Sequence, residues 1–233
     1  MLEPVSVTTH LPRMQRGLTM VELLIGMAVG LFIVAAAASL MTGNLRENRN
    51  LLIESRLIQD LRTAADMITR DLRRAGYWAA ANAGVRTDGN PTVLANPYVE
   101  VTPGNAPADN VSFRFSRDTT ENNAVDSNEQ FGFRLRNGAI ELQLGTGNWQ
   151  ALTDANTLTV TEFSVTPTIE EVSLAGFCTT PCPSGSTTCP PKQQVRSLAV
   201  VIGGRATGDA RLARSVRSQV RLRNDPIVGT CGA

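Results

Sequence analysis

The sequence has almost no lysine and almost no histidine. Lys192 is the sole lysine and His10 the sole histidine among 233 residues, and His10 lies in an N-terminal stretch that we expect to be removed. A mature chain without an imidazole cannot form a Ser-His-Asp or Cys-His catalytic group, and it has no histidine to offer a metal ion. These absences argue against a hydrolytic active site and against a histidine-based metal centre.

A strong charge of either sign is also missing. The chain has 22 basic and 21 acidic residues, and its arginines form no dense run. A nucleic-acid contact would therefore have to come from scattered arginines. The sequence shows no evident nucleic-acid site.

The remaining candidates for chemistry have plainer structural interpretations. Gly203-Gly204 and Gly208 are followed by no phosphate-loop lysine, so we expect turn residues there. Glu170-Glu171 is typical of a solvated strand end, and Lys192 follows two prolines in an expected loop. We find no catalytic constellation and predict that the protein is not an enzyme and uses no cofactor.

One long apolar run stands near the N-terminus. Residues 23–41 are 19 residues without a charge, and a helix of that length spans roughly 28 Å, close to the bilayer core. The leader before it, residues 1–17, carries Arg13 and Arg16 next to the run, which favours a cytoplasmic leader. The rest of the chain is then exported to the periplasm.

Glu22 lies at the start of this run, although a charge held in hydrocarbon costs about 2.5–3.5 kcal/mol. Three interpretations compete. Thr19 and Glu22 fit a capping box at a helix start. The run could instead be an ordinary secretory signal cleaved after Ala38, which an acid in its apolar region disfavours.

In the third interpretation the chain is cleaved after Gly17, so the apolar run stays on the mature protein and Leu18 gains a free amine. A carboxylate among packed helices is tolerable when an opposite charge neutralises it, and a neighbouring subunit's N-terminal amine is the natural partner. Glu22 would then set the register between subunits.

The segment RGLTMVELL, residues 16–24, resembles the class III leader junction of type IV pilins and type II secretion pseudopilins. The resemblance implies that a prepilin peptidase cuts between Gly17 and Leu18 and methylates Leu18, and that Glu22 serves in assembly. Leu18 departs from the phenylalanine most often found at that position.

Beyond the apolar run the pattern becomes amphipathic. Apolar residues recur every three or four positions, with charged residues largely on the other faces. A single helix from about Thr19 to Ala75 is the economical prediction, about 85 Å long, with Gly76 just past its end and a bend or local melting at Gly43 and Asn44. The apolar positions are Leu57, Leu61, Ala64, Ile68, Leu72 and Ala75.

The C-terminal part reads as an antiparallel sheet. Asn137-Gly138 is a strong hairpin signal between two strands. Residues 76–109 form a predicted partly ordered loop, which in pilins helps to set subunit contacts but could equally be an excursion without a partner. We expect strands at residues 110–116, 130–136, 139–144, 158–165, 195–202 and 215–223.

Four cysteines lie in the exported part, namely Cys178, Cys182, Cys189 and Cys231. Export to an oxidising compartment favours two disulfides, whose pairing the sequence leaves open among three possibilities. A closure of some 40 to 50 residues with Cys231 would contribute roughly 4 kcal/mol. The spacing lacks a paired CxxC, so we predict no metal site.

Two further segments narrow the resemblance. Residues 70–78, RDLRRAGYW, and 220–224, VRLRN, are similar to the helix end and closing strand of PilW-type minor pilins. The resemblance implies an α+β type IV pilin-like fold with a leader (1–17), a transmembrane half-helix (18–42), an amphipathic half-helix (43–75) and a periplasmic head (76–233).

The function implied is that of a minor pilin that primes type IV pilus assembly and is incorporated into the pilus at the tip complex. Its partners would be other minor pilins, the major pilin, the prepilin peptidase and the inner-membrane assembly platform. It would be anchored in the inner membrane and then displayed in the surface pilus. Two alternatives remain: a J-type minor pseudopilin of a type II secretion system, and a membrane-anchored periplasmic binding or enzymatic domain.

Overall fold

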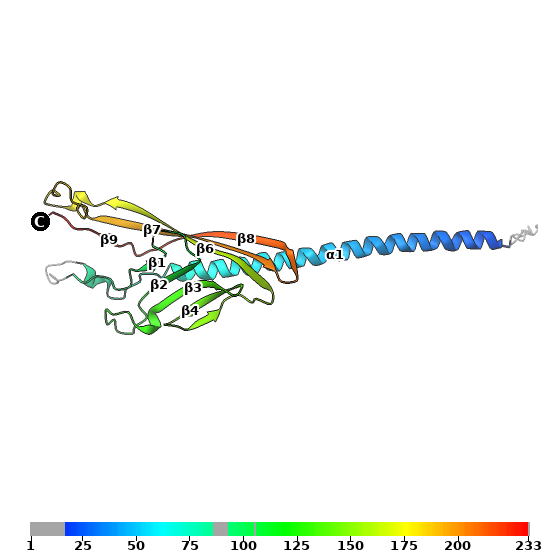
Figure 1. Cartoon of the computed structure of the whole chain (residues 1–233), viewed down its shortest axis with the longest axis horizontal. Coiled ribbons are helices and arrows are strands. Elements are labelled where there is room, and N and C mark those ends of the chain that lie inside the picture. The colour runs from blue at the N-terminus through cyan, green and yellow to red at the C-terminus, as the bar shows by residue number, and fades with distance from the viewer. Residues whose placement is uncertain (1–16, 86–92, 105, 233) are drawn as a thin grey trace, which may run out of the picture. The chain divides into compact units, whose positions relative to one another are not determined.

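The computed structural model describes residues 17–85, 93–104 and 106–232. Within these residues a long helix, α1 (Met20–Leu72), precedes a series of antiparallel strands (Figure 1). The predicted α+β, pilin-like architecture is confirmed. The other elements are η1 (Ala81–Gly84), β1 (Val101–Thr102), β2 (Asn110–Arg114), η2 (Ser127–Glu129), β3 (Gln130–Arg136), β4 (Ala139–Leu144), β5 (Trp149–Ala151), β6 (Leu158–Ser173), η3 (Ala175–Phe177), β7 (Lys192–Ala206), β8 (Asp209–Arg221) and β9 (Ile227–Val228).

Helix α1 contributes to two compact units that divide between Leu51 and Leu52. It continues as regular helix through Gly43 and Asn44, so the local melting expected there is not seen. One glycine costs a helix only about 1 kcal/mol, which a helix of 53 residues tolerates. After Leu72 the chain turns, and Gly76 has a φ of 75°, as expected of a glycine that follows a helix end.

The second part of α1 buries one face in the head unit. The predicted apolar stripe is confirmed, and Leu61, Ile68 and Leu72 have no exposed surface. Ala65 and Thr69 are buried as well, which widens the stripe beyond the pattern read from the sequence. The face is completed by Leu57, Ala64 and Ala75.

In the described part of the chain the strands form two antiparallel sheets. The first has the order β1-β2-β3-β4-β5. Its β3–β4 hairpin turns at Asn137 and Gly138, whose φ values of 50° and 74° fit the predicted two-residue turn, in which both central residues have positive φ.

The second sheet has the order β6-β7-β8, and the short strand β9 also pairs with β7. Its strands differ from the predicted ranges: β6 ends later, β7 extends further at both ends, and β8 both starts and ends earlier. The added residues mix polar residues and glycines with a few apolar ones, such as the buried Ala206, and they show no sustained apolar alternation. Glu171 and Lys192, expected in a strand end and a loop, face each other across β6 and β7 at 2.7 Å. This ion pair lowers the pKa of Glu171.

Gly203 and Gly204 lie inside β7, so the prediction of a turn there was wrong; Gly208 does lie in the β7–β8 turn. Both glycines face an irregularity in β6 between Val160 and Glu162. A Cβ atom at position 204 would lie 2.5 Å from Leu158 and 3.5 Å from Leu61. The glycine therefore marks a close approach of side chains to the strand rather than a turn.

One hydrophobic core joins the buried face of α1 to both sheets. In Figure 1 the latter part of α1 lies between β7–β8 and β2–β3. Four phenylalanine rings stack on or just beyond the strands of the first sheet, and in the four contacting pairs the ring centroids are 4.1 to 6.2 Å apart. The four are Phe113, Phe115, Phe131 and Phe133.

Candidate functional site

The N-terminal junction is the first part of the candidate site. Gly17 and Leu18 precede α1, and the Thr19 hydroxyl accepts a hydrogen bond from the Glu22 N–H at 3.3 Å. Thr19 is thus the N-cap residue. This is one half of the predicted capping box; in the described residues the Glu22 carboxylate makes no return hydrogen bond to the Thr19 N–H. The leader residues Arg13 and Arg16 lie outside the described residues.

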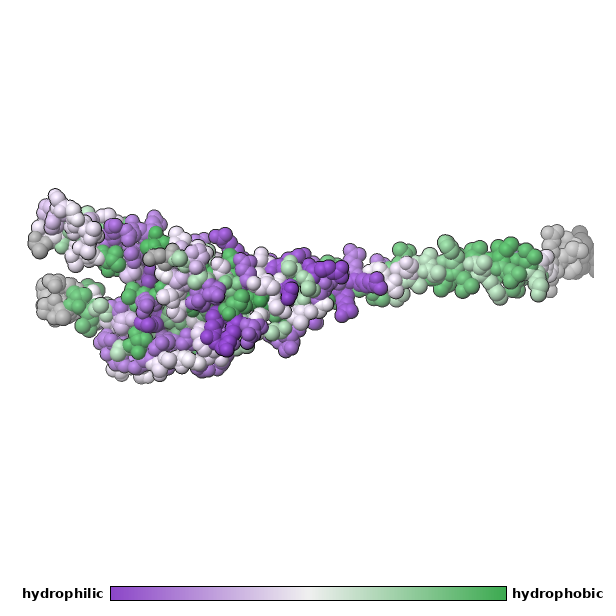
Figure 2. All heavy atoms as spheres, viewed as in Figure 1, coloured by the Kyte–Doolittle hydropathy of each residue, from purple (hydrophilic) through white to green (hydrophobic). Residues whose placement is uncertain are grey.

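The helix that follows exposes its apolar side chains on every face. Helix α1 is long and apolar enough to cross a membrane, and its most apolar window has no buried residue. Figure 2 shows hydrophobic residues over this stretch of α1. Exposed examples include Leu18, Met20 and Phe32, at 73%, 85% and 77%. Since burying a large apolar side chain contributes about 1.5–3 kcal/mol, such a surface favours lipid or other apolar helices over water.

Glu22 is the one acid of this apolar segment. In the described residues the ion pairs all involve other carboxylates, so the Glu22 carboxylate is available to a group from outside the chain. The first turn of a helix favours an acid because its free N–H groups carry partial positive charge. The geometry therefore permits both the capping role and pairing with another molecule.

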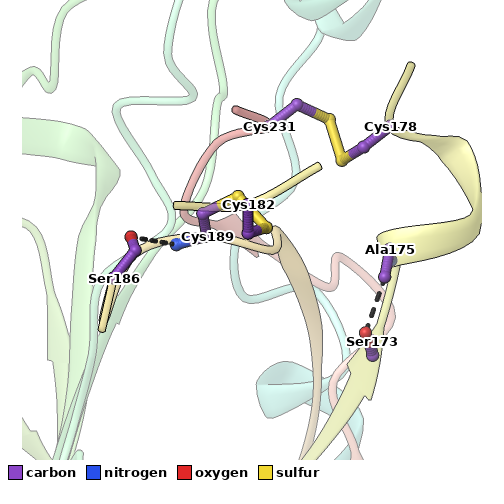
Figure 3. The surroundings of a disulfide bond; sticks show 7 residues. All are labelled: Ser173, Ala175, Cys178, Cys182, Ser186, Cys189 and Cys231. Carbon is purple, nitrogen blue, oxygen red and sulfur yellow. Dashed lines mark hydrogen bonds between the residues drawn. A yellow bond between two sulfur atoms is a disulfide. The ribbon is translucent and has the colours of Figure 1, made fainter. Parts of the chain in front are cut away.

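The four cysteines form two disulfides, Cys178–Cys231 and Cys182–Cys189 (Figure 3). The first closes 53 residues and fixes the C-terminal tail to the loop between β6 and β7, and the second closes 7 residues within that loop. Backbone bonds support the tail: β9 pairs with the start of β7, and the Thr230 N–H donates to the Thr188 carbonyl at 2.9 Å. The sequence predicted the disulfides but could not choose this pairing.

A buried carboxylate that the sequence analysis missed organises the loop before β3. Glu129 has no exposed surface. Its oxygens accept hydrogen bonds from the Arg117 N–H at 2.7 Å, the Asp126 N–H at 2.9 Å and the Tyr98 hydroxyl at 3.0 Å. The D-x-x-E spacing of Asp126 and Glu129, a capping box in the structure, was the available signal.

Two neighbours of Glu129, namely Tyr98 and Glu121, have shifted pKa values. Burial raises the pKa of Tyr98, and the Glu121 and Glu129 carboxylates raise it further. Burial acts to raise the pKa of Glu121, but hydrogen bonds, including those from Asn123 N–H and the Tyr98 hydroxyl, outweigh it and hold the pKa below its usual range. The ligand atoms of Asp118, Asp126 and Glu129 lie within 4.8 Å of one another, but Glu129 already has its three protein donors.

A Glu129→Gln variant is expected to unfold with a free energy about 1–3 kcal/mol below that of the native protein. The amide keeps one acceptor oxygen and turns an N–H₂ group toward donors, which leaves buried donors without a partner. Urea denaturation of the full chain in a nonionic detergent, followed by tryptophan fluorescence, measures the change. An unchanged midpoint would contradict this structural role for Glu129.

Asp118→Asn is the matched control, and we expect it to stabilise the protein at neutral pH. Partial desolvation and the charges of Glu129 and Asp126 raise the pKa of Asp118. A carboxylate with a raised folded-state pKa destabilises the fold once both states are ionised, and protonation at lower pH removes that cost. The advantage of the variant should disappear as the pH falls below the Asp118 pKa; an advantage independent of pH would contradict this assignment.

Two protein-family models match the sequence. The model described as Prepilin peptidase-dependent protein B matches residues 50–222, or 173 of the 233 residues. The model described as Prokaryotic N-terminal methylation motif matches residues 12–38, a range that contains Gly17, Leu18 and Glu22. No curated protein and no solved structure matches the chain. The two matches cover the head and the apolar segment, the same two parts that the geometry distinguishes.

Proposed function

Because this chain belongs to the prepilin peptidase-dependent protein B family and carries the N-terminal methylation motif, we propose that it is a PilW-type minor pilin. In this role it primes the assembly of type IV pili and is built into them at the tip complex. The role is structural rather than enzymatic. Its partners are other minor pilins, the major pilin and the inner-membrane assembly platform.

One observation carries this proposal, namely an apolar half-helix whose side chains are exposed and whose first turn holds an acid. A soluble protein would bury such a surface in its own core, whereas the apolar part of α1 has no partner within the described residues. Lipid can cover it before assembly, and the equivalent helices of other subunits can cover it in a filament. A subunit that moves from membrane to filament needs a surface that suits both.

Processing by the prepilin peptidase is the second step of the proposal. The cleaved bond joins Gly17 to Leu18, two residues before the first residue of α1. Because both residues lie outside the helix, an enzyme can bind the backbone there without unwinding the helix. Cleavage frees the Leu18 amine, which is then methylated while the apolar helix stays in the inner membrane.

Glu22 and the new amine provide the register of assembly. Leu18 and Glu22 lie four residues apart, which is about one helical turn. In a stack of parallel helices, the amine of an incoming subunit can pair with the Glu22 carboxylate of a subunit already in place. An unpaired charge among packed helices is costly, so the pair favours one axial register over others.

Deletion of the gene tests the pilus assignment against a role as a J-type pseudopilin of a type II secretion system. On our proposal, the deletion strain loses surface pili and still secretes its exoproteins, and the native gene restores the pili. The strain should be scored for both traits by electron microscopy of sheared surface fibres and by assay of culture-supernatant proteins. Normal pili with failed secretion would overturn the pilus assignment.

A further inference from the structure

Four exposed arginines from distant parts of the chain meet beyond the end of α1. Arg73 and Arg74 follow the last residue of the helix, Arg221 is the last residue of β8, and Arg223 comes two residues later. We call these four residues the arginine cluster. About 150 residues separate its two halves in the sequence, so the charge patch has no local sequence signal.

A hydrogen bond holds the two halves of the cluster together. The Asn224 side chain donates to the Ala75 carbonyl at 3.0 Å, which satisfies a free carbonyl just past the helix. Asn224 follows Arg223 directly, and Ala75 follows Arg74. The backbone positions of Arg74 and Arg223 are therefore fixed beside each other.

The arginine cluster carries little compensating negative charge. Arg221 pairs with Asp225 at 2.9 Å, and the Arg74 guanidinium stacks over the Phe115 ring at 4.1 Å. Among the described residues, the ion pairs include none for Arg73, Arg74 or Arg223. Four cations thus face one anion, and the surplus charge is open to solvent.

Two adjoining surface depressions lie over the cluster. One, of about 500 Å³, is lined by Arg73, Gln219, Val220, Arg221 and Arg223. The other, of about 360 Å³, includes Arg73 and Arg223 again, together with Arg74, Tyr77, Phe115 and Asn224. No carboxylate of the described residues lines either depression. The Tyr77 side chain is 51% exposed, so an aromatic ring stands beside the arginine-lined depression.

We propose that this surface binds single-stranded nucleic acid. Guanidinium groups form paired hydrogen bonds with phosphate oxygens, and the arginine-lined depression offers three of them. An exposed aromatic ring provides a stacking surface for an unpaired base. A phosphate site beside a ring matches the repeating unit of a nucleic-acid strand, whereas an acidic peptide would supply only the negative charge.

Fluorescence anisotropy with a labelled DNA strand of about 20 nucleotides tests the arginines, using the full chain in a nonionic detergent. The double variant Arg73→Gln/Arg223→Gln should weaken binding about tenfold for each arginine removed. It should also reduce the slope of the logarithm of the association constant against the logarithm of the salt concentration by about 1.4. Arg205→Gln/Arg211→Gln is the matched control, since it removes two exposed charges elsewhere on the same sheet. If the two double variants weaken binding equally, the arginine cluster is not the binding site.

Tyr77 separates the proposed ligand from other polyanions. Tyr77→Ala should weaken single-strand binding about fivefold or more and leave duplex binding unchanged, while Tyr77→Phe should bind as the native protein does. Duplex binding as tight as single-strand binding would contradict the stacking of an unpaired base on Tyr77.

Competition with poly-L-glutamate distinguishes a nucleic acid from an acidic protein. At equal charge, this polymer should fail to displace the labelled strand. Displacement by the polymer would instead indicate an acidic protein partner. Binding is measured on isolated protein, so the result does not depend on filament assembly.

Discussion

A Glu22→Ala variant is expected to enter the membrane and be cleaved normally, yet to be lost from the assembled pilus. Membrane entry depends on the apolarity of the run, which alanine does not reduce, and cleavage takes place at the Gly17–Leu18 bond, four residues before Glu22. In a filament, however, the neighbouring amine would remain among apolar helices without its counter-charge. Removing one partner of a buried ion pair costs about 3 kcal/mol or more, which corresponds to a loss of incorporation of roughly a hundredfold.

The amounts of the protein in the membrane and in sheared pili should be compared by quantitative immunoblotting. Glu47→Ala is the matched control, because Glu47 is an exposed acid of the same helix and lies beyond the apolar run. It should leave incorporation within about twofold of normal. Glu22→Ala pili that contain the normal amount of the protein would contradict the role of Glu22 in setting the register.

The two disulfides are expected to differ in their contributions to the stability of the head. By the loop-entropy relation, a closure of 53 residues stabilises by about 4 kcal/mol and a closure of 7 residues by about 2 kcal/mol. The Cys178→Ser/Cys231→Ser variant should therefore lose about 4 kcal/mol of unfolding free energy. Each variant keeps the other disulfide and leaves no free thiol.

Denaturation by guanidinium, followed by the fluorescence of Trp78 and Trp149, measures both variants. Trp78 is buried and Trp149 lies in β5, so both tryptophans report on the head. Cys182→Ser/Cys189→Ser is the matched control and should lose about 2 kcal/mol. Equal losses, or a larger loss in the control, would contradict the prediction that the Cys178–Cys231 disulfide contributes more to stability than the other.

Local patterns predicted much of the fold. The stripe of α1 and the Asn137-Gly138 hairpin depend on residues close together in the sequence, and the structure confirms both. Gly203 and Gly204 were misassigned because a glycine pair is typical of a turn. In the structure, a side chain at position 204 would instead collide with Leu158 and contact Leu61. Leu158 and Leu61 lie more than 40 and more than 140 residues before Gly204 in the sequence, so local patterns could not reveal these contacts.

The features of the head that the sequence did not reveal depend on contacts of the same long-range kind. Glu129 lies in a segment of acids, asparagines and threonines that reads as solvated, and it is buried because Tyr98 and the backbone of Arg117 supply its donors. The arginine cluster needs both the end of α1 and the end of β8. By contrast, the N-terminal junction is continuous in sequence, so its capping geometry could be predicted directly.

Intact-mass and N-terminal analysis of the protein isolated from membranes and from sheared pili tests the central claim most directly. That claim is that the apolar half-helix stays on the mature protein, behind a newly formed amine. The account predicts that the mature chain begins at Leu18 and that this residue carries one methyl group. A mature chain that begins at Ser39, freed from the membrane by an ordinary secretory cleavage, would contradict it.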